Sequence, residues 1–290
     1  MTDLIQSLAS LGRRYDAVFC DLWGCLHNGK TPFPAAVAAL QGFRQRGGKV
    51  ILLTNAPRPR TSVAAQLDRM GVPRDAWDQI VTSGDATQYA LFSGTYGSKV
   101  AFIGAPKDEP FFTDLPTDIT PTAITRVEME AAEVLLCTGL ADDLTETPED
   151  YRLPLMRARN DGLPMLCANP DIIVDYGDKR LWCAGALAQE YEAMGGRALY
   201  FGKPHPPVYD LARRRLAEMG CRDPQILCIG DGVHTDIQGG MAEGLDTLFV
   251  TGGISVTEFG PDADNPDLGL LRDWLAAKLL SATFSIAALR

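Results

Sequence analysis

Residues 18–26 read Val-Phe-Cys-Asp-Leu-Trp-Gly-Cys-Leu, and this stretch decides the fold. A short apolar run ends at Asp21, and Gly24 follows three residues later. Such a run followed by a glycine-containing turn is typical of a buried β-strand that leads into a loop. A carboxylate at the end of a buried strand is costly unless it has a charged or hydrogen-bonding partner. We therefore expect Asp21 to belong to a site that other parts of the chain complete.

Two later apolar runs also lead to ionisable residues. Residues 198–201 lead to Lys203. Residues 226–229 lead to Asp231 and then to Asp236. In open α/β sheets, ligands bind at the carboxyl ends of the strands. Three carboxylates and one lysine at such ends predict a site for a hard cation and a phosphoryl group.

Apolar strands, polar or glycine-containing turns and amphipathic helices alternate through both halves of the chain. The helix expected after Asp21 has its apolar residues on one face, at Ala36, Val37, Leu40 and Phe43. Strands that read as continuous apolar runs and alternate with helices favour a parallel sheet covered on both faces. The expected strands of this sheet are residues 18–20, 50–53, 80–83, 198–201, 226–229 and 247–250.

The segment between these halves has strands and helices of its own and is long enough for a small domain. Residues 100–103, 134–137 and 165–167 read as strands, and residues 185–194 read as a helix. The predicted fold is therefore α/β, a Rossmann-like doubly wound parallel sheet core with an inserted α/β cap domain. The expected core covers residues 1–95 and 198–290, and the expected cap covers residues 96–197.

The composition argues against several classes of protein. The chain has 290 residues, of which 46% are hydrophobic, and a formal net charge of -10. This charge would repel a phosphate-rich polymer, so we expect no nucleic-acid partner. No segment approaches the roughly 18 apolar residues of a membrane span, so we expect a cytoplasmic protein with no membrane partner. The seven cysteines form no C-x-x-C pair and are expected to be buried small hydrophobic residues.

Five short motifs occur in order along nearly the whole chain. They are Asp21-x-Trp-Gly-x-Leu, Thr54-Asn55, Asn169-Pro170-Asp171, Gly202-Lys203-Pro204 and Gly230-Asp231-x-x-x-Thr235-Asp236. Each motif alone is a weak signal, but their order and spacing together are specific. In these motifs the chain resembles the haloacid dehalogenase superfamily. The resemblance is to its phosphatase branch with a type IIA cap, similar to p-nitrophenyl phosphatases and pyridoxal phosphate phosphatases.

The resemblance implies a nucleophile and a metal site. Asp21 is expected to attack phosphorus and form an aspartyl-phosphate intermediate. A weak carboxylate nucleophile needs the phosphoryl charge neutralised, and a hard cation does this. The expected cation is Mg²⁺, held by Asp21, Asp231 and Asp236 and by the backbone carbonyl of Trp23.

The resemblance also implies which residues bind the phosphoryl group. Lys203 is expected to bring a positive charge to the nucleophile and the phosphoryl oxygens. The Thr54 hydroxyl and the Asn55 backbone N–H are expected to donate hydrogen bonds to the transferring group. Asn169-Pro170-Asp171 is expected to be a turn rather than a substrate contact. Arg58, after a proline, is expected to be a surface residue.

Position 23 departs from the pattern of the superfamily. Its phosphatases usually carry a second aspartate two residues after the nucleophile, where it protonates the leaving oxygen. This chain has Trp23, and an indole cannot exchange a proton in that way. One of the histidines (His27, His205 and His234) could supply the proton, although His205 and His234 are expected at the rim. Otherwise the leaving group needs little help, as in an acyl phosphate, or the ligand is bound without efficient turnover.

The leading interpretation is a Mg²⁺-dependent phosphatase for a small phosphorylated metabolite, with the cap closing over the site. The alternative is a phospho-ligand-binding or regulatory protein with weak or no turnover. A metal-free dehalogenase is less favoured, because Asp231 and Asp236 would repel the charge on Asp21. A homodimer is compatible with the sequence, which does not identify the metabolite.

Overall fold

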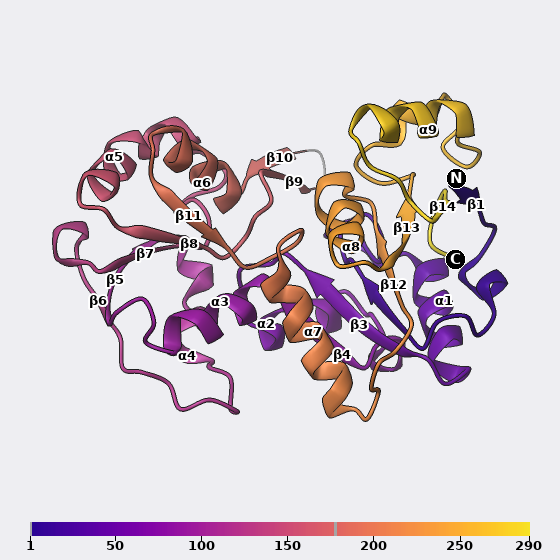
Figure 1. Cartoon of the computed structure of the whole chain (residues 1–290), viewed down its shortest axis with the longest axis horizontal. Helices are drawn as coiled ribbons and strands as arrows, with labels where there is room; N and C mark the ends of the chain where they lie inside the picture. The colour runs from indigo at the N-terminus through magenta and orange to yellow at the C-terminus, as the bar shows by residue number, and fades with distance from the viewer. Residues whose placement is uncertain (1, 177–178) are drawn as a thin grey trace. The chain divides into compact units, whose positions relative to one another are not determined.

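The computed structural model describes residues 2–176 and 179–290, and these form two compact units (Figure 1). The first unit comprises residues 1–54, 65–81 and 209–290, and the second comprises residues 55–64 and 82–208. Each unit is built around a β-sheet of its own.

The sheet of the first unit has seven strands in the order β1-β14-β13-β12-β2-β3-β4. Neighbouring strands from β1 to β3 in this order pair in parallel. Strand β2 is in the interior of the sheet, and all four of its residues are buried, as the continuous apolar run predicts. The strands are β1 (Asp3–Leu4), β2 (Ala17–Cys20), β3 (Lys49–Thr54), β4 (Gln79–Thr82), β12 (Ile226–Gly230), β13 (Asp246–Val250) and β14 (Phe284–Ile286).

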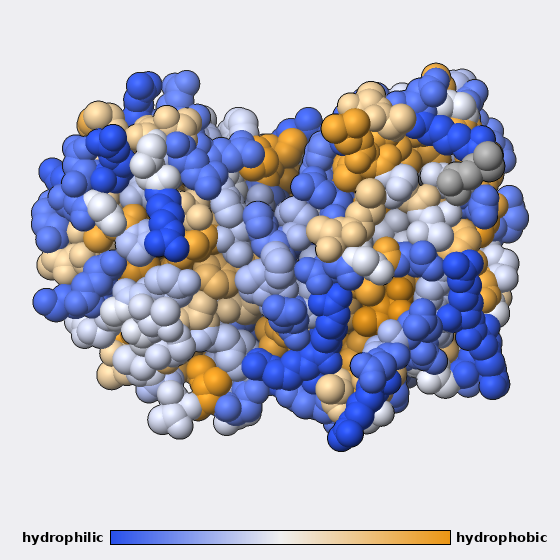
Figure 2. All heavy atoms as spheres, viewed as in Figure 1, coloured by the Kyte–Doolittle hydropathy of each residue, from blue (hydrophilic) through white to orange (hydrophobic). Residues whose placement is uncertain are grey.

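Helix α1 (Pro34–Gln45), and α7 (Pro206–Glu218), which enters the first unit at residue 209, each bury one apolar face. In α1 the buried residues are Ala36, Val37, Leu40 and Phe43, which confirms the predicted face. In α7 Val208, Ala212 and Leu216 are buried, and Figure 2 shows hydrophilic side chains over the opposite face. The other elements are η1 (Leu8–Leu11), η2 (Arg74–Ala76), η6 (Val233–Ile237), α8 (Gln238–Ala242), η7 (Val256–Phe259) and α9 (Leu268–Ala277). Helix α2 (Arg60–Arg69) belongs to the first unit only from residue 65 on.

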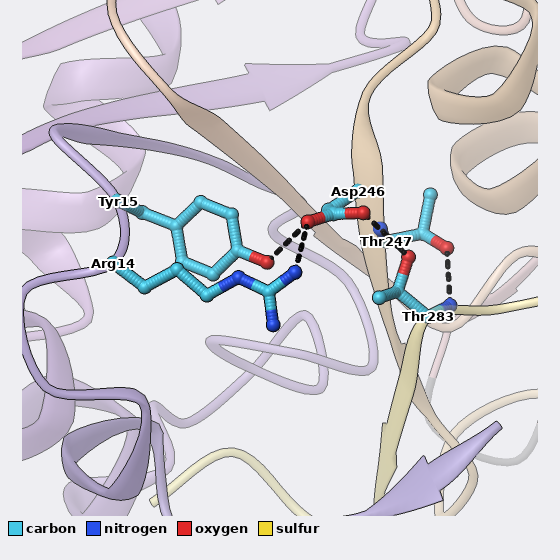
Figure 3. Close-up of polar contacts among 5 residues, drawn as sticks. All are labelled: Arg14, Tyr15, Asp246, Thr247 and Thr283. Carbon is cyan, nitrogen blue, oxygen red and sulfur yellow. Dashed lines mark hydrogen bonds and ion pairs between the residues drawn. The ribbon is translucent and has the colours of Figure 1, made fainter.

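Polar side chains tie the segment before β2 to the beginning of β13 and β14 (Figure 3). The Asp246 carboxylate accepts hydrogen bonds from Tyr15 Oη at 2.5 Å, Arg14 Nη2 at 3.2 Å and Thr283 Oγ1 at 3.1 Å. Burial, followed by the hydrogen bond to Asp246, raises the pKa of the Tyr15 hydroxyl above its ordinary value. Because Asp246 begins its strand, this network lies at the amino edge of the sheet and fastens strand ends to one another.

The second unit has a five-stranded sheet in the order β11-β8-β7-β5-β6, with parallel pairing throughout. An antiparallel pair, β9 (Ile173–Tyr176) and β10 (Lys179–Trp182), forms a separate sheet. The strands of the larger sheet are β5 (Lys99–Ile103), β6 (Thr125–Arg126), β7 (Val134–Cys137), β8 (Pro164–Cys167) and β11 (Arg197–Tyr200). The helices are α3 (Ser83–Phe92), η3 (Pro106–Asp108), α4 (Pro110–Thr113), η4 (Met129–Ala131), η5 (Pro148–Tyr151), α5 (Arg152–Asn160) and α6 (Ala184–Ala193).

The α/β fold with parallel sheets agrees with the prediction, but one strand was assigned to the wrong sheet. The run 198–201 was expected in the core, whereas β11 pairs with β8 in the second unit. This strand lies at an edge, and its residues are exposed or half-buried. An apolar run identifies a strand but does not identify its neighbour. The limits of the compact units also differ from the domain boundaries 95/96 and 197/198, which stay a prediction.

All seven cysteines are free thiols, and all but Cys221 are buried, as expected. Among the described residues, no helix has the length and hydropathy of a membrane span.

Candidate functional site

Three predicted site residues of the first unit lie at adjacent strand ends. Asp21 follows the last residue of β2, Asp231 follows the last residue of β12, and Thr54 ends β3. Strand β2 pairs with both β12 and β3, in parallel. The carboxyl ends of the three strands therefore meet at one edge of the sheet, although residues 21 and 231 are far apart in the sequence. Asp21 and Asp231 are each 8% exposed, so two carboxylates are withdrawn from water together.

Asp21 and Asp231 approach each other closely, and Cys25 joins them. One carboxylate oxygen of each aspartate and the Sγ of Cys25 all lie within 4.8 Å of one another. Among the described residues, these three side chains form a group that could hold a metal ion. Burial, and then the charges of Asp231 and Asp21, raises the pKa of the Cys25 thiol well above its ordinary value. The thiol is thus a poor ligand for a hard cation, and oxygen is the donor that fits.

Asp236 is held by the loop that follows β12. It lies in η6 and is 5% exposed. Its Oδ2 accepts hydrogen bonds from the Gly232 backbone N–H at 3.1 Å and from Thr235 Oγ1 at 3.3 Å. Asp231 has a similar backbone contact, since its Oδ2 accepts from the Ile254 N–H at 2.9 Å. These donors stabilise the ionised form of each carboxylate.

Glycines make room for the carboxylates. A Cβ on Gly24 or Gly253 would lie 2.0 Å or 2.1 Å from Asp231 Oδ2. A Cβ on Gly230 would lie 2.0 Å from the Cγ of Asp236. Gly24 also has a φ of +72°, which favours glycine. Buried carboxylate oxygens in a close-fitting glycine cradle are a donor set that suits Mg²⁺.

Trp23 and His27 occupy the loop after Asp21. Their ring centroids are 5.4 Å apart with an interplanar angle of 73°, an edge-to-face contact. His27 is 1% exposed, and its Nδ1 accepts a hydrogen bond from the Gly29 N–H at 3.0 Å. Burial lowers the pKa of His27 to about 4. His27 is therefore neutral at neutral pH and does not suit the role of replacement acid.

The other two histidines differ in their surroundings. His205, in the second unit, stacks on Tyr200 with centroids 4.7 Å apart, and burial lowers the pKa of its imidazole. His234 is exposed, and its Nδ1 is 3.3 Å from Gln238 Oε1.

Asn55 and Lys203, in the second unit, form one buried network. The Lys203 backbone N–H donates to Asn55 Oδ1 at 2.7 Å, and Asn55 Nδ2 donates to the Lys203 carbonyl at 3.0 Å. Asn55 Nδ2 also donates to Asp171 Oδ1 at 2.8 Å. A Cβ on Gly202 would lie 2.4 Å from Asn55 Oδ1, so this glycine permits the approach. The asparagine side chain thus positions the backbone that carries Lys203.

Asn169-Pro170-Asp171 is more than a turn. Asn169 Oδ1 does accept from the Asp171 N–H at 3.1 Å, as in an Asx turn. The Asp171 side chain, however, is a partner of Asn55, a contact that the sequence analysis missed. The available signal was the position of this motif directly after a buried strand, β8, whose neighbour β11 leads to Lys203.

A buried carboxyl group in the second unit was also missed. Asp108 is 2% exposed and accepts a hydrogen bond from Thr138 Oγ1 at 2.9 Å. Burial raises the pKa of this carboxyl, and the charge of Arg58 opposes the rise. Asp108 lies between Lys107 and Glu109 in the sequence, and a run of three charged residues carries no signal of burial.

The structure thus distributes the predicted site residues over both units. The first unit holds Asp21, Trp23, Thr54, Asp231 and Asp236, and the second holds Asn55 and Lys203. The assignment of all seven to one catalytic site stays a prediction.

Comparison with known proteins points to one family. Residues 18–115 match the family model of haloacid dehalogenase-like hydrolases, and residues 200–274 match a related model of that hydrolase type. A solved haloacid dehalogenase-like hydrolase from Brucella suis 1330 is 42% identical, covers 99% of this chain and 100% of its own, and has a TM-score of 0.84.

Two less similar proteins have names that state an enzymatic activity. The ribonucleotide monophosphatase NagD of Escherichia coli K12 is 27% identical over 249 residues, which are 82% of this chain and 88% of NagD. The magnesium complex of the glycerol phosphate phosphatase Rv1692 of Mycobacterium tuberculosis has a TM-score of 0.63 at 24% identity. That match covers 86% of this chain and 71% of Rv1692, and it supports the fold.

Proposed function

Because this chain belongs to the family of haloacid dehalogenase-like hydrolases, we propose that it is a Mg²⁺-dependent phosphatase acting on a small phosphorylated metabolite. The observation that carries the proposal is the cradle of buried carboxylates, with Asp21 and Asp231 oxygens within 4.8 Å at the carboxyl edge of the sheet. NagD, a nucleotide monophosphatase, and Rv1692, a phosphatase with bound magnesium, support the same activity.

The proposed metal ligands are the carboxylates of Asp21, Asp231 and Asp236 and the backbone carbonyl of Trp23. Bound Mg²⁺ supplies charge neutralisation, so that an anionic nucleophile can approach an anionic ester. Without a cation, the carboxylates near Asp21 would repel its charge, which argues against a metal-free dehalogenase.

The proposed reaction has two steps at Asp21. One carboxylate oxygen attacks phosphorus, the bond from phosphorus to the leaving oxygen breaks, and that oxygen takes the electron pair. Water then attacks the aspartyl phosphate, which releases inorganic phosphate and restores the carboxylate. The Lys203 ammonium, the Thr54 hydroxyl and the Asn55 N–H are proposed to bind the oxygens of the transferring group.

Because Trp23 replaces the acid, the rate of turnover should depend on how readily the leaving group departs. No acid at position 23 protonates the departing oxygen, and His27 is buried and neutral. The carboxylate or aryloxide that leaves from an acyl or aryl phosphate is a much weaker base than an alkoxide and depends less on that proton. We therefore expect such compounds to be turned over faster than alkyl phosphates. The same observation favours, as a second candidate, a protein that binds a phosphorylated ligand and turns it over weakly.

The test is a substrate screen with acetyl, p-nitrophenyl and alkyl phosphates, with Mg²⁺ and with EDTA. Turnover that needs Mg²⁺ and is lost in Asp21→Asn would support the phosphatase. Tight binding of beryllium fluoride, a mimic of the aspartyl phosphate, without turnover of any compound would support the binding protein. If the protein neither turns over any of these compounds nor binds beryllium fluoride, both candidate functions are refuted.

A further inference from the structure

Two residues of its own loop contact the indole of Trp23. His27 makes the edge-to-face contact, and the two residues also form a backbone bridge. The second is Gly29, on which a Cβ would lie 2.3 Å from Cη2 and 2.4 Å from Cζ3 of the indole. The far edge of the ring therefore occupies space that every residue except glycine would fill.

His27 contacts both Trp23 and Gly29. Its Nδ1 accepts from the Gly29 N–H, so in the neutral ring the proton resides on Nε2. Its backbone N–H donates to the Leu22 carbonyl at 3.0 Å, and its carbonyl accepts from the Gly24 N–H at 3.0 Å. One buried ring thus contacts the indole and anchors the glycine beneath it.

Core packing does not account for this arrangement. Trp23 is half-buried, whereas His27, which supports it, is almost completely buried. Two peptide units separate Trp23 from Asp21, so their Cα atoms are within about 7.6 Å. A loop that immobilises a partly exposed aromatic ring this close to a nucleophile keeps that ring in a defined place for something to contact.

We propose that the indole of Trp23 contacts the leaving group of the substrate and selects planar acyl or aryl groups, with His27 and Gly29 as positioning residues. This rests on the proposed phosphatase function and names its substrate class. An aromatic contact of this kind contributes about 2-fold to 10-fold in affinity. It recruits the same leaving groups that depart without a proton, so one residue explains both the missing acid and the preference.

The positioning role is tested by ¹⁹F NMR of protein labelled with fluorotryptophan, in which Trp23→Phe identifies the Trp23 resonance. Gly29→Ala should shift or broaden that resonance, because its Cβ displaces the ring. Gly71→Ala is the matched control, since Gly71 has a φ of +78° against +85° for Gly29 but has no atom within 4 Å of a Cβ. An unchanged Trp23 resonance in folded Gly29→Ala would overturn the positioning role.

His27 offers a second pair of variants if Gly29→Ala does not fold. His27→Phe keeps a ring against Trp23 but loses the acceptor for the Gly29 N–H. His27→Asn keeps an acceptor but loses the ring. Both should move the Trp23 resonance and raise KM for phenyl phosphate more than they lower kcat. A resonance and a KM that stay at the wild-type values in both variants would overturn the positioning role.

The leaving-group contact is tested with phenyl phosphate and ethyl phosphate. Trp23→Leu should raise KM for phenyl phosphate about 2-fold to 10-fold more than KM for ethyl phosphate, while Trp23→Phe should keep most of the preference. Equal effects on both esters would overturn the contact and leave the phosphatase standing. If the wild type turns over neither ester nor acetyl phosphate, phosphatase function fails by itself. Titration of labelled Asp21→Asn protein with phenyl phosphate and Mg²⁺ then decides the contact: a selective shift of the Trp23 resonance supports it, and no shift refutes it.

Discussion

Trp23 and His27 show how two side chains can change the chemistry expected of a motif. Trp23 has the place two residues after Asp21, and its ring meets the edge of a buried imidazole. Burial keeps that imidazole neutral down to a pH of about 4, so the pair offers an aromatic surface and no proton. A carboxyl group at position 23 would supply the missing acid.

We predict that Trp23→Asp raises kcat for ethyl phosphate by about tenfold or more, because general acid–base catalysis contributes about 10²–10⁴-fold. Acetyl phosphate should gain much less, since its leaving oxygen departs without a proton. Trp23→Asn removes the indole without providing an acid and is the matched control. Steady-state kinetics with both substrates measure the effect, and similar gains for the Asp and Asn variants would contradict it.

His27 should make the protein less stable in mild acid. Its pKa is about 4 in the folded chain against an ordinary value of 6.5, so the unfolded chain binds a proton first as pH falls. The free energy of unfolding should therefore decrease between pH 7 and pH 5, with a contribution from His27 of about 2 kcal/mol. Urea unfolding at both pH values measures this. In His27→Phe, whose ring does not titrate, the decrease should be smaller by that amount, and an equal decrease would refute the assignment.

At the scale of elements, the loops after β2 and β12 and the loop after β13 converge on the carboxylates. Gly24 and Gly253 come from the loops after β2 and β13, Gly230 is the last residue of β12, and all three leave space for Asp231 or Asp236. The loops would separate if any of the glycines carried a side chain, because the nearest carboxylate atoms are closer than a real Cβ contact allows. The cradle is thus a property of three elements together.

We predict that Gly253→Ala weakens Mg²⁺ binding by about tenfold or more, because the Cβ would displace Asp231 from a position that a hard cation requires. Gly42→Ala, in α1, is the control, since its closest neighbour is the tip of the Arg46 side chain at 3.4 Å. Isothermal titration with Mg²⁺ gives the affinities of both variants. Wild-type affinity in a folded Gly253→Ala protein would show that the cradle does not hold the metal.

At the scale of the whole molecule, metal binding should be coupled to folding. The carboxylates of Asp21 and Asp231 come together only when β2 and β12 pair, so the unfolded chain has no comparable site. A ligand that binds the folded state alone stabilises it, by about 2.7 kcal/mol at a concentration 100 times its Kd. The chain as a whole, with a net charge of -10, also benefits from a bound cation.

We therefore predict that saturating Mg²⁺ raises the Tm, that EDTA reverses the rise, and that Asp231→Asn removes most of it. Thermal unfolding at constant ionic strength measures the three conditions, with Na⁺ compensating for charge. A rise of the same size in Asp231→Asn would mean that Mg²⁺ acts through the general charge of the surface.

Much of the fold could be predicted because the spacing of apolar residues along the chain identifies strands and helices. The run before Asp21 reads as a buried strand, and the apolar spacing from Ala36 to Phe43 reads as a helix face, so both were predicted correctly. The strand β11 was placed in the wrong sheet, because pairing depends on which neighbour buries an edge strand. The partnership of Asn55 with Asp171 and the burial of Asp108 were missed for a similar reason, since each depends on residues distant in sequence.

The sequence by itself determined the strands and helices, the order of the motifs and the family, because hydrophobic periodicity and short-range spacing are local properties. Only the tertiary structure decided what surrounds each ionisable group. It showed that His27 is neutral, that Asp231 fits among glycines and that the Trp23 ring lies over Gly29. Solvation, charge and excluded volume depend on atoms brought together from distant segments, so they come into being only when the chain is folded.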